Sequence, residues 1–182
     1  MTQARAETWA EAFPALPNSL PPILGLEDAA ALAALRNHST SLPYRLNMAA
    51  VYQDEATRAW ACQTVAEAAS LVGEDAVRCQ WWDMHQLSDP LVGAEAFRGA
   101  EPADMLIVAI RAVERLPVAF YAWISSGLGH RSRRDGLLVA LLAASKRPCA
   151  LRKVLRRYLE GLARSNHLDF LACEQNLAAS IP

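Results

Sequence analysis

The segment from Asp104 to Ala112 constrains the fold of this chain more than any other. It reads Asp-Met-Leu-Ile-Val-Ala-Ile-Arg-Ala, so an unbroken apolar centre lies between two charged residues. That centre is too short for an independent helix and has no polar side to face water. It predicts a strand in the middle of a sheet that is buried on both faces.

Strand-like and helix-like segments alternate along the chain on both sides of this strand. Runs that predict strands begin near Leu46, Val77, Asp104, Leu137 and Leu168, and helical spacing fills 56–72, 89–98, 117–128 and 150–164 between them. Such alternation requires right-handed β-α-β crossovers and a parallel sheet with helices on both faces. The second and fifth strands are mixed in character and suit the edges. The sequence therefore predicts a three-layer α/β/α fold with a five-stranded parallel sheet of order 2-1-3-4-5.

The second predicted strand has an alternating pattern. Val77, Cys79 and Trp81 share one side, while the other side, which carries Arg78, Gln80 and Trp82, is expected to face water. A polar side of this kind fits an edge strand better than a central one.

Proline separates the first part of the chain from the rest. Pro14, Pro17, Pro21, Pro22 and Pro43 interrupt any long element, so residues 1–43 are expected to be an N-terminal arm, partly disordered. Within the arm, residues 26–36 are rich in Ala and Leu at helical spacing and predict one short helix that docks on the domain. An α/β domain over 44–175 and a C-terminal tail over 176–182 complete the organisation. The 182 residues, 53% of them hydrophobic, suffice for one sizeable core.

Composition excludes several classes of protein. A net charge of -1 argues against coating nucleic acid or an anionic membrane through bulk charge. The four cysteines are widely spaced within or beside apolar segments, which indicates buried thiols in a reducing compartment and neither a zinc site nor a redox motif. We find no signal sequence and no run long enough to span a membrane, so we expect a soluble cytoplasmic protein without metal or cofactor.

Polar residues after the predicted strands define a candidate site. In open α/β sheets, ligands bind beyond the carboxyl ends of the strands. The residues expected there are Asp54, Glu55, Asp83, Arg111, Ser145 and Lys146. Asp54 and Glu55 could cap the helix that follows them or belong to the site. Arg111 could pair with one of these carboxylates, or it could hold a small anion together with Lys146.

Basic side chains define a second candidate surface. Arg131, Arg133 and Arg134 lie in a loop, and Arg152 and Arg156 lie on the predicted outer side of the helix at 150–164. Such residues are either a solvated face or a contact for a protein partner, with nucleic acid the weaker alternative. A homodimer is one such protein partner.

The stretch from about Tyr44 to Glu174 resembles the receiver domain of bacterial response regulators, within the flavodoxin-like group. The resemblance rests on an acidic turn after the first strand, on Asp-Met-Leu-Ile-Val in the third, and on Leu116-Pro117 shortly after it. In receivers the acidic pair binds magnesium, an aspartate ending strand three accepts phosphate, a Ser or Thr ends strand four, and a Lys ends strand five.

Only the first of these receiver features is present. Asp54 and Glu55 match the acidic pair, slightly late in the turn. The phosphoacceptor position falls on Ala109, or on Arg111 if the strand runs longer, and neither forms an acyl phosphate. Ser145 is a displaced match, and strand five ends in Cys173-Glu174 without a lysine. The resemblance thus implies a degenerate pseudo-receiver.

Two functions remain open at this point. The first is a non-catalytic, receiver-like signalling or protein-interaction module. The second is a small enzyme or anionic-ligand-binding domain that uses the crevice near Asp54, Asp83 and Arg111. An unpaired Arg111 in a deep pocket favours the second function, whereas an Arg111–carboxylate pair favours the first.

Overall fold

The computed structural model describes residues 45–111, 116–131, 135–143 and 150–177. The expected arm with its helix at 26–36 and most of the expected tail lie outside these ranges. None of the helices within them is long and apolar enough to cross a membrane.

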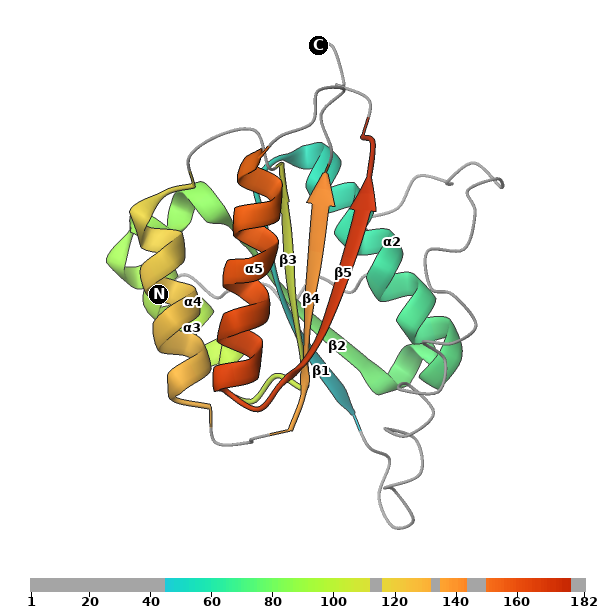
Figure 1. Ribbon diagram of the computed structural model, residues 1–182. Helices are drawn as coiled ribbons and strands as arrows, with labels where there is room; N and C mark the ends of the chain where they lie inside the picture. Colours follow the sequence, from blue (N-terminus) through green and yellow to red (C-terminus); the bar gives the residue numbers. More distant parts are fainter. Residues whose placement is uncertain (1–44, 112–115, 132–134, 144–149, 178–182) are drawn as a thin grey trace. The chain divides into compact units, whose positions relative to one another are not determined.

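The described residues form the predicted α/β architecture (Figure 1). In chain order the elements are β1 (Leu46–Tyr52), α2 (Glu55–Val72), β2 (Val77–Asp83), α3 (Pro90–Ala100), β3 (Met105–Arg111), α4 (Val118–Gly129), β4 (Leu137–Ala143), α5 (Ala150–Ser165) and β5 (Asp169–Gln175), with 3-10 turns at Glu74–Ala76 and Met84–Ser88. All strand pairs are parallel, and their order is β2-β1-β3-β4-β5. The predicted fold class and strand order are confirmed.

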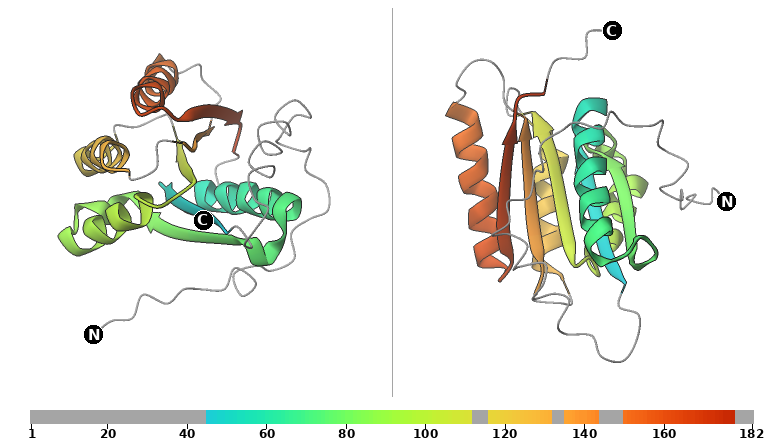
Figure 2. Two further views of the ribbon diagram at one scale, coloured as in Figure 1. Left: turned by 90° about the horizontal axis from the view of Figure 1, so that it is seen from below. Right: turned by 90° about the vertical axis from the view of Figure 1, so that its right-hand side faces the viewer.

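The helices lie on both faces of the sheet but are unequally shared. Figures 1 and 2 show α3, α4 and α5 on one face and α2 on the other. Right-handed crossovers dictate this division, because the chain moves one way across the sheet from β1 to β2 and the opposite way from β2 to β5. The main hydrophobic core lies under α3, α4 and α5, where Leu106, Val108, Leu138 and Leu142 of the central strands are at most 1% exposed.

The central strand has the burial that its composition predicts. Every residue of β3 from Met105 to Ile110 is buried, and only Arg111 at its end is partly exposed. Asp104 fixes the start of the strand, since one of its carboxylate oxygens accepts a hydrogen bond from the Asn47 backbone N–H at 2.9 Å. An otherwise apolar strand thus places one charged side chain, that of Arg111, at the carboxyl edge of the sheet.

The prediction that one side of β2 faces water is confirmed for Arg78 and Gln80 and is wrong for Trp82. Arg78 and Gln80 are exposed, as expected at an edge, whereas Trp82 packs against the main core beneath α3. The α3 backbone can approach this closely because Gly99 lacks the Cβ that would clash with the Gln80 and Trp82 side chains. On the other side of the strand, Cys79 is partly buried, and this burial raises the pKa of its thiol.

Candidate functional site

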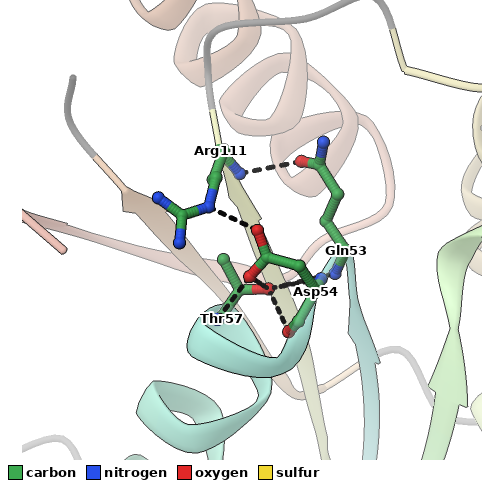
Figure 3. Close-up of polar contacts among 4 residues, drawn as sticks. All are labelled: Gln53, Asp54, Thr57 and Arg111. Atoms are coloured by element: carbon green, nitrogen blue, oxygen red, sulfur yellow. Dashed lines mark hydrogen bonds and ion pairs between the residues drawn. The ribbon is translucent and has the colours of Figure 1, made fainter. Parts of the chain in front are cut away.

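The ends of β1 and β3 bring three polar residues together (Figure 3). Gln53 and Asp54 directly follow β1, and Arg111 is the last residue of β3, the neighbouring strand. The Arg111 Nε donates to Asp54 Oδ2 in an ion pair, and the Arg111 backbone N–H donates to Gln53 Oε1 at 2.8 Å. The Gln53 backbone N–H in turn donates to the Ala109 carbonyl oxygen at 3.1 Å. Side-chain bonds therefore continue the pairing of the two strands beyond their regular ladder.

The other carboxylate oxygen of Asp54 caps helix α2. Asp54 Oδ1 accepts from the Thr57 backbone N–H at 2.8 Å, and Thr57 Oγ1 accepts from the Asp54 backbone N–H at 2.9 Å. This reciprocal capping box satisfies two donors at the helix start. The sequence left open whether Asp54 caps the helix or belongs to the site, and the structure shows that one side chain does both.

Electrostatics favour the charged form of Asp54. Partial burial raises its pKa, but hydrogen bonds from the Thr57 backbone and the Arg111 guanidinium, with the charge of Arg111, outweigh burial and leave the pKa below its usual value. The Asp54 side chain is 37% exposed and that of Arg111 is 23% exposed. The pair therefore lies at the rim of the sheet, within reach of solvent.

The remaining predicted site residues do not join this cluster by any contact that the structure shows. Glu55 is turned outward, with its side chain 83% exposed, and pairs with Arg58 at 3.7 Å. Asp83 accepts from the His85 backbone N–H at 2.8 Å and so caps the turn after β2. Ser145 and Lys146 lie outside the described residues.

Gln53 is the residue that the sequence did not single out strongly enough. The sequence predicts the acidic pair Asp54 and Glu55 as site residues, whereas Gln53 and Asp54 are the two side chains that face Arg111 (Figure 3). The signal was positional, because the first polar residue after an apolar strand stands at the edge of the sheet. Glu55 is already the first residue of α2 and is carried away from the site.

The predicted partner surface divides into separate parts. The Arg131 guanidinium reaches back to the backbone, donating to the carbonyl oxygens of Ala103 and Asp135 at 2.5 Å and 3.3 Å. Arg152 and Arg156 of α5 both pair with Glu174 of β5, at 3.2 Å and 3.8 Å. Arg133 and Arg134 lie outside the described residues.

The site offers hydrogen bonding and charge pairing, and the Asp54 carboxylate and the Thr57 hydroxyl within it are both engaged in hydrogen bonds. At the position where the receiver resemblance places a phosphoacceptor, Ala109 is fully buried and carries only a methyl group. Among the described residues, no three His, Cys, Asp or Glu side chains are grouped so that they could hold a metal ion. The sequence matches no known family profile and none of the curated proteins.

Proposed function

We propose that this protein is a non-catalytic, receiver-like signalling or protein-interaction module that lacks the phosphoacceptor aspartate. The observation that carries the proposal is the Arg111–Asp54 ion pair at the ends of β1 and β3. An arginine here occupies the end of the strand where a receiver would carry its reactive carboxylate. The pair neutralises the carboxylate that would otherwise attract a cation.

The ion pair also weighs against the alternative, an enzyme or anion-binding domain. An anion-binding arginine presents an unpaired positive charge to its ligand, whereas the Arg111 Nε donates to Asp54 and the charge of Arg111 is paired with that carboxylate. Breaking that pair would leave a partly buried charge without its counterion, which costs free energy. We therefore assign the cluster a structural role in fixing the strand ends.

The proposed partner is a protein that meets the basic outer side of α5. Lys153, Arg156 and Arg157 are exposed there, and exposed Val154 lies among them with 61% of its surface accessible. A basic surface with an apolar contact suits an acidic protein better than a phosphate backbone. A homodimer is the simplest case of such a partner, and light scattering at several concentrations tests it; a monomer throughout would remove the homodimer from the proposal.

Incubation with magnesium and acetyl phosphate tests the lost phosphorylation directly. Intact-mass spectrometry is expected to show an unmodified chain, because neither Ala109 nor Arg111 can accept a phosphoryl group. A phosphate adduct that hydroxylamine removes would identify an acyl phosphate and overturn the proposal. The Asp54→Asn variant serves as the control that asks whether any adduct sits on Asp54.

A further inference from the structure

Three exposed apolar side chains lie near the same end of three neighbouring helices. Helices α3, α4 and α5 each follow a strand of the parallel sheet, so all three begin at its carboxyl edge (Figure 1). Leu91 in the first turn of α3 is 78% exposed, Val118 at the start of α4 is 83% exposed, and Val154 in the second turn of α5 is 61% exposed. They are three of the four large hydrophobic side chains that are exposed in the described part of the chain. Their gathering on one helical layer marks that layer as a contact surface.

Helix α4 lies between the other two helices and carries no charged residue. Its sequence is Val-Ala-Phe-Tyr-Ala-Trp-Ile-Ser-Ser-Gly-Leu-Gly. On one side the ring of His130, next to the end of α4, contacts Phe97 of α3, and on the other side Ser125 Oγ lies 3.1 Å from Tyr158 Oη of α5. Apart from Val118, the exposed residues of α4 are all small: Ala122, Ser125, Ser126 and Gly129. Small side chains without charge allow a second helix to approach α4 closely.

The helices on the two sides of α4 carry opposite charge. The segment 89–101, which holds α3, has three carboxylates and one cation, whereas α5 has five cations and one carboxylate. Glu95 and Lys153 are exposed, and neither forms an ion pair with a described residue. Glu95 lies about 200° around α3 from Phe97, and Lys153 lies about 140° around α5 from Tyr158. Because Phe97 and Tyr158 mark the sides that adjoin α4, both charges lie at the outer rims of the layer.

Opposite charges on the two outer helices make the layer complementary to itself. We propose that α3, α4 and α5 form the contact between two copies of this chain, related by a twofold axis that runs along α4. About this axis α4 lies against α4 of the partner, and α3 of each copy lies against α5 of the other. Val118 meets its counterpart near the axis, and Leu91 covers the partner's Val154. At the rims Glu95 pairs with the partner's Lys153, and the symmetry forms this pair twice.

Charge selects both the second copy and the direction of the axis. A twofold axis across the helices would place α5 against α5 and bring cations together, which disfavours association. Three helices about 10 Å wide and about 18 Å long cover about 500 Å² per copy, at the low end of specific interfaces. The dimer is therefore expected to be weak and reversible. The inference rests on the proposed function, because it names the partner of the proposed interaction module.

Reversal of single charges tests the rim contacts. Lys153→Glu sets carboxylates against each other at both symmetric positions and is expected to weaken the dimer about tenfold. Glu95→Lys is expected to have the same effect with opposing cations. A mixture of the two variants brings opposite charges together again at both positions, so it should form a heterodimer with the affinity of the wild type. Arg45→Glu reverses an exposed charge before β1, at the amino edge of the sheet, and should leave the affinity unchanged.

Sedimentation velocity of the full chain from about 1 to about 200 μM measures these affinities. A wild-type chain that stays monomeric, or a mixture that associates no better than either variant alone, would overturn the proposed dimer. The two proposals fail separately. A monomer would leave the proposed function with a different acidic protein as partner, whereas a phosphate adduct that hydroxylamine removes would overturn the proposed function without affecting the measured dimer.

A disulfide across the axis tests how the two copies are oriented. Val118→Cys is expected to form a covalent dimer with oxidised glutathione, because the two introduced thiols lie close together beside the axis. Leu71→Cys introduces a thiol at another exposed position, on α2 at the opposite face of the sheet, and should stay monomeric. The wild-type chain, treated in the same way, reports on the native cysteines. No covalent dimer of Val118→Cys, or equal amounts from both variants, would contradict the proposed contact.

Discussion

The side chain of Asp54 connects helix α2 to the charged residue Arg111 at the end of strand β3. Its two carboxylate oxygens are divided between the start of α2 and the end of β3, so a single side chain ties the first strand–helix unit to the centre of the sheet. Asparagine would preserve the cap, since it is as good an N-cap as aspartate, but it would lose the charge opposite Arg111. The two roles of Asp54 are therefore separable by substitution.

The pH dependence of stability should reveal the Asp54–Arg111 pair. Because the Asp54 pKa is lower in the folded chain than in the unfolded one, the unfolded chain takes up the proton first as the pH falls. The contribution of the pair is present above about pH 4 and is lost as the pH falls through the folded-state pKa. Solvent screening limits the contribution of the pair to the free energy of unfolding to about 1 kcal/mol or less. Urea unfolding from about pH 3 to pH 7 should show a flatter profile for Asp54→Asn than for the wild type.

Glu55→Gln is the matched control for this measurement. Glu55 is the next residue, but its side chain is far more exposed and it pairs only with Arg58 on the helix surface. Its replacement should leave the acid limb of the stability profile close to that of the wild type. Identical profiles for Asp54→Asn and the wild type would contradict the electrostatic role that we assign to the pair.

Two glycines should respond in opposite directions to alanine. Gly73 ends α2 with a φ of 103°, a conformation that a residue with a Cβ adopts only under strain. Gly161 lies inside α5 with open space around its Cα, so alanine gains helix propensity there. We expect Gly73→Ala to lower the free energy of unfolding by about 1 kcal/mol and Gly161→Ala to raise it by up to about 1 kcal/mol. Chemical denaturation measures both, and a stabilising Gly73→Ala would show that the C-cap is not strained.

At the scale of elements, α5 holds the edge of the sheet mainly through its apolar side. Leu155, Leu159 and Ala163 are buried against the core, whereas the ion pairs from α5 to Glu174 lie near the surface. Surface pairs of this kind typically contribute less than about 1 kcal/mol each. The attachment of α5 to the sheet therefore depends on burial more than on charge.

Truncating one leucine of α5 should separate these contributions. Leu159 is fully buried, and Leu159→Ala is expected to cost about 2 to 5 kcal/mol of unfolding free energy through lost contacts and a cavity. Val154 lies on the same helix but is largely exposed, so Val154→Ala should change stability by less than about 0.5 kcal/mol. Similar losses in the two variants, measured by denaturant titration, would argue against the observed orientation of α5.

Helices and strands could be predicted from the sequence where burial alone decides which residues they contain. The bounds of β4 coincide with a continuous apolar run, and β1 departs from one only at Asn47, since a central parallel strand tolerates no polar side. The strand order followed from which runs were mixed in composition. Trp82 was harder to place, because its position beneath α3 depends on Gly99, a contact between residues distant in sequence.

The candidate site was predictable in outline but not in detail. The sequence placed Asp54 and Arg111 at neighbouring strand ends and included their ion pair among its alternatives. It assigned no role to Gln53, because that role requires the exact length of β1 and the start of α2, and a one-residue shift would put Asp54 in its place. Asp83 was expected in the site because β2 ends there, yet local capping of the following turn satisfies its carboxylate.

At the scale of the whole molecule, the sheet carries an ion pair close to the strand end where the receiver resemblance would place the phosphoacceptor. Strand β3 is apolar up to its last residue, and the polar groups at the ends of β1 and β3 bond to one another. This arrangement fixes the edge of the sheet, and we therefore propose that the protein binds its partner through the surface of its helices. The proposed function therefore depends on the state of one cluster, Gln53, Asp54 and Arg111.

Nuclear magnetic resonance of that cluster is the most direct test of the proposal. The Arg111 Nε–H cross-peak and the Gln53 and Arg111 backbone amides would be followed during titration with magnesium and beryllium fluoride, a phosphoryl analogue. The closed ion pair predicts that none of these resonances shifts, while Asp54→Asn alone displaces the Arg111 Nε–H signal. Saturable shifts of these resonances in the wild-type chain would show that the strand ends accept a phosphoryl group and a cation, and would contradict the proposal.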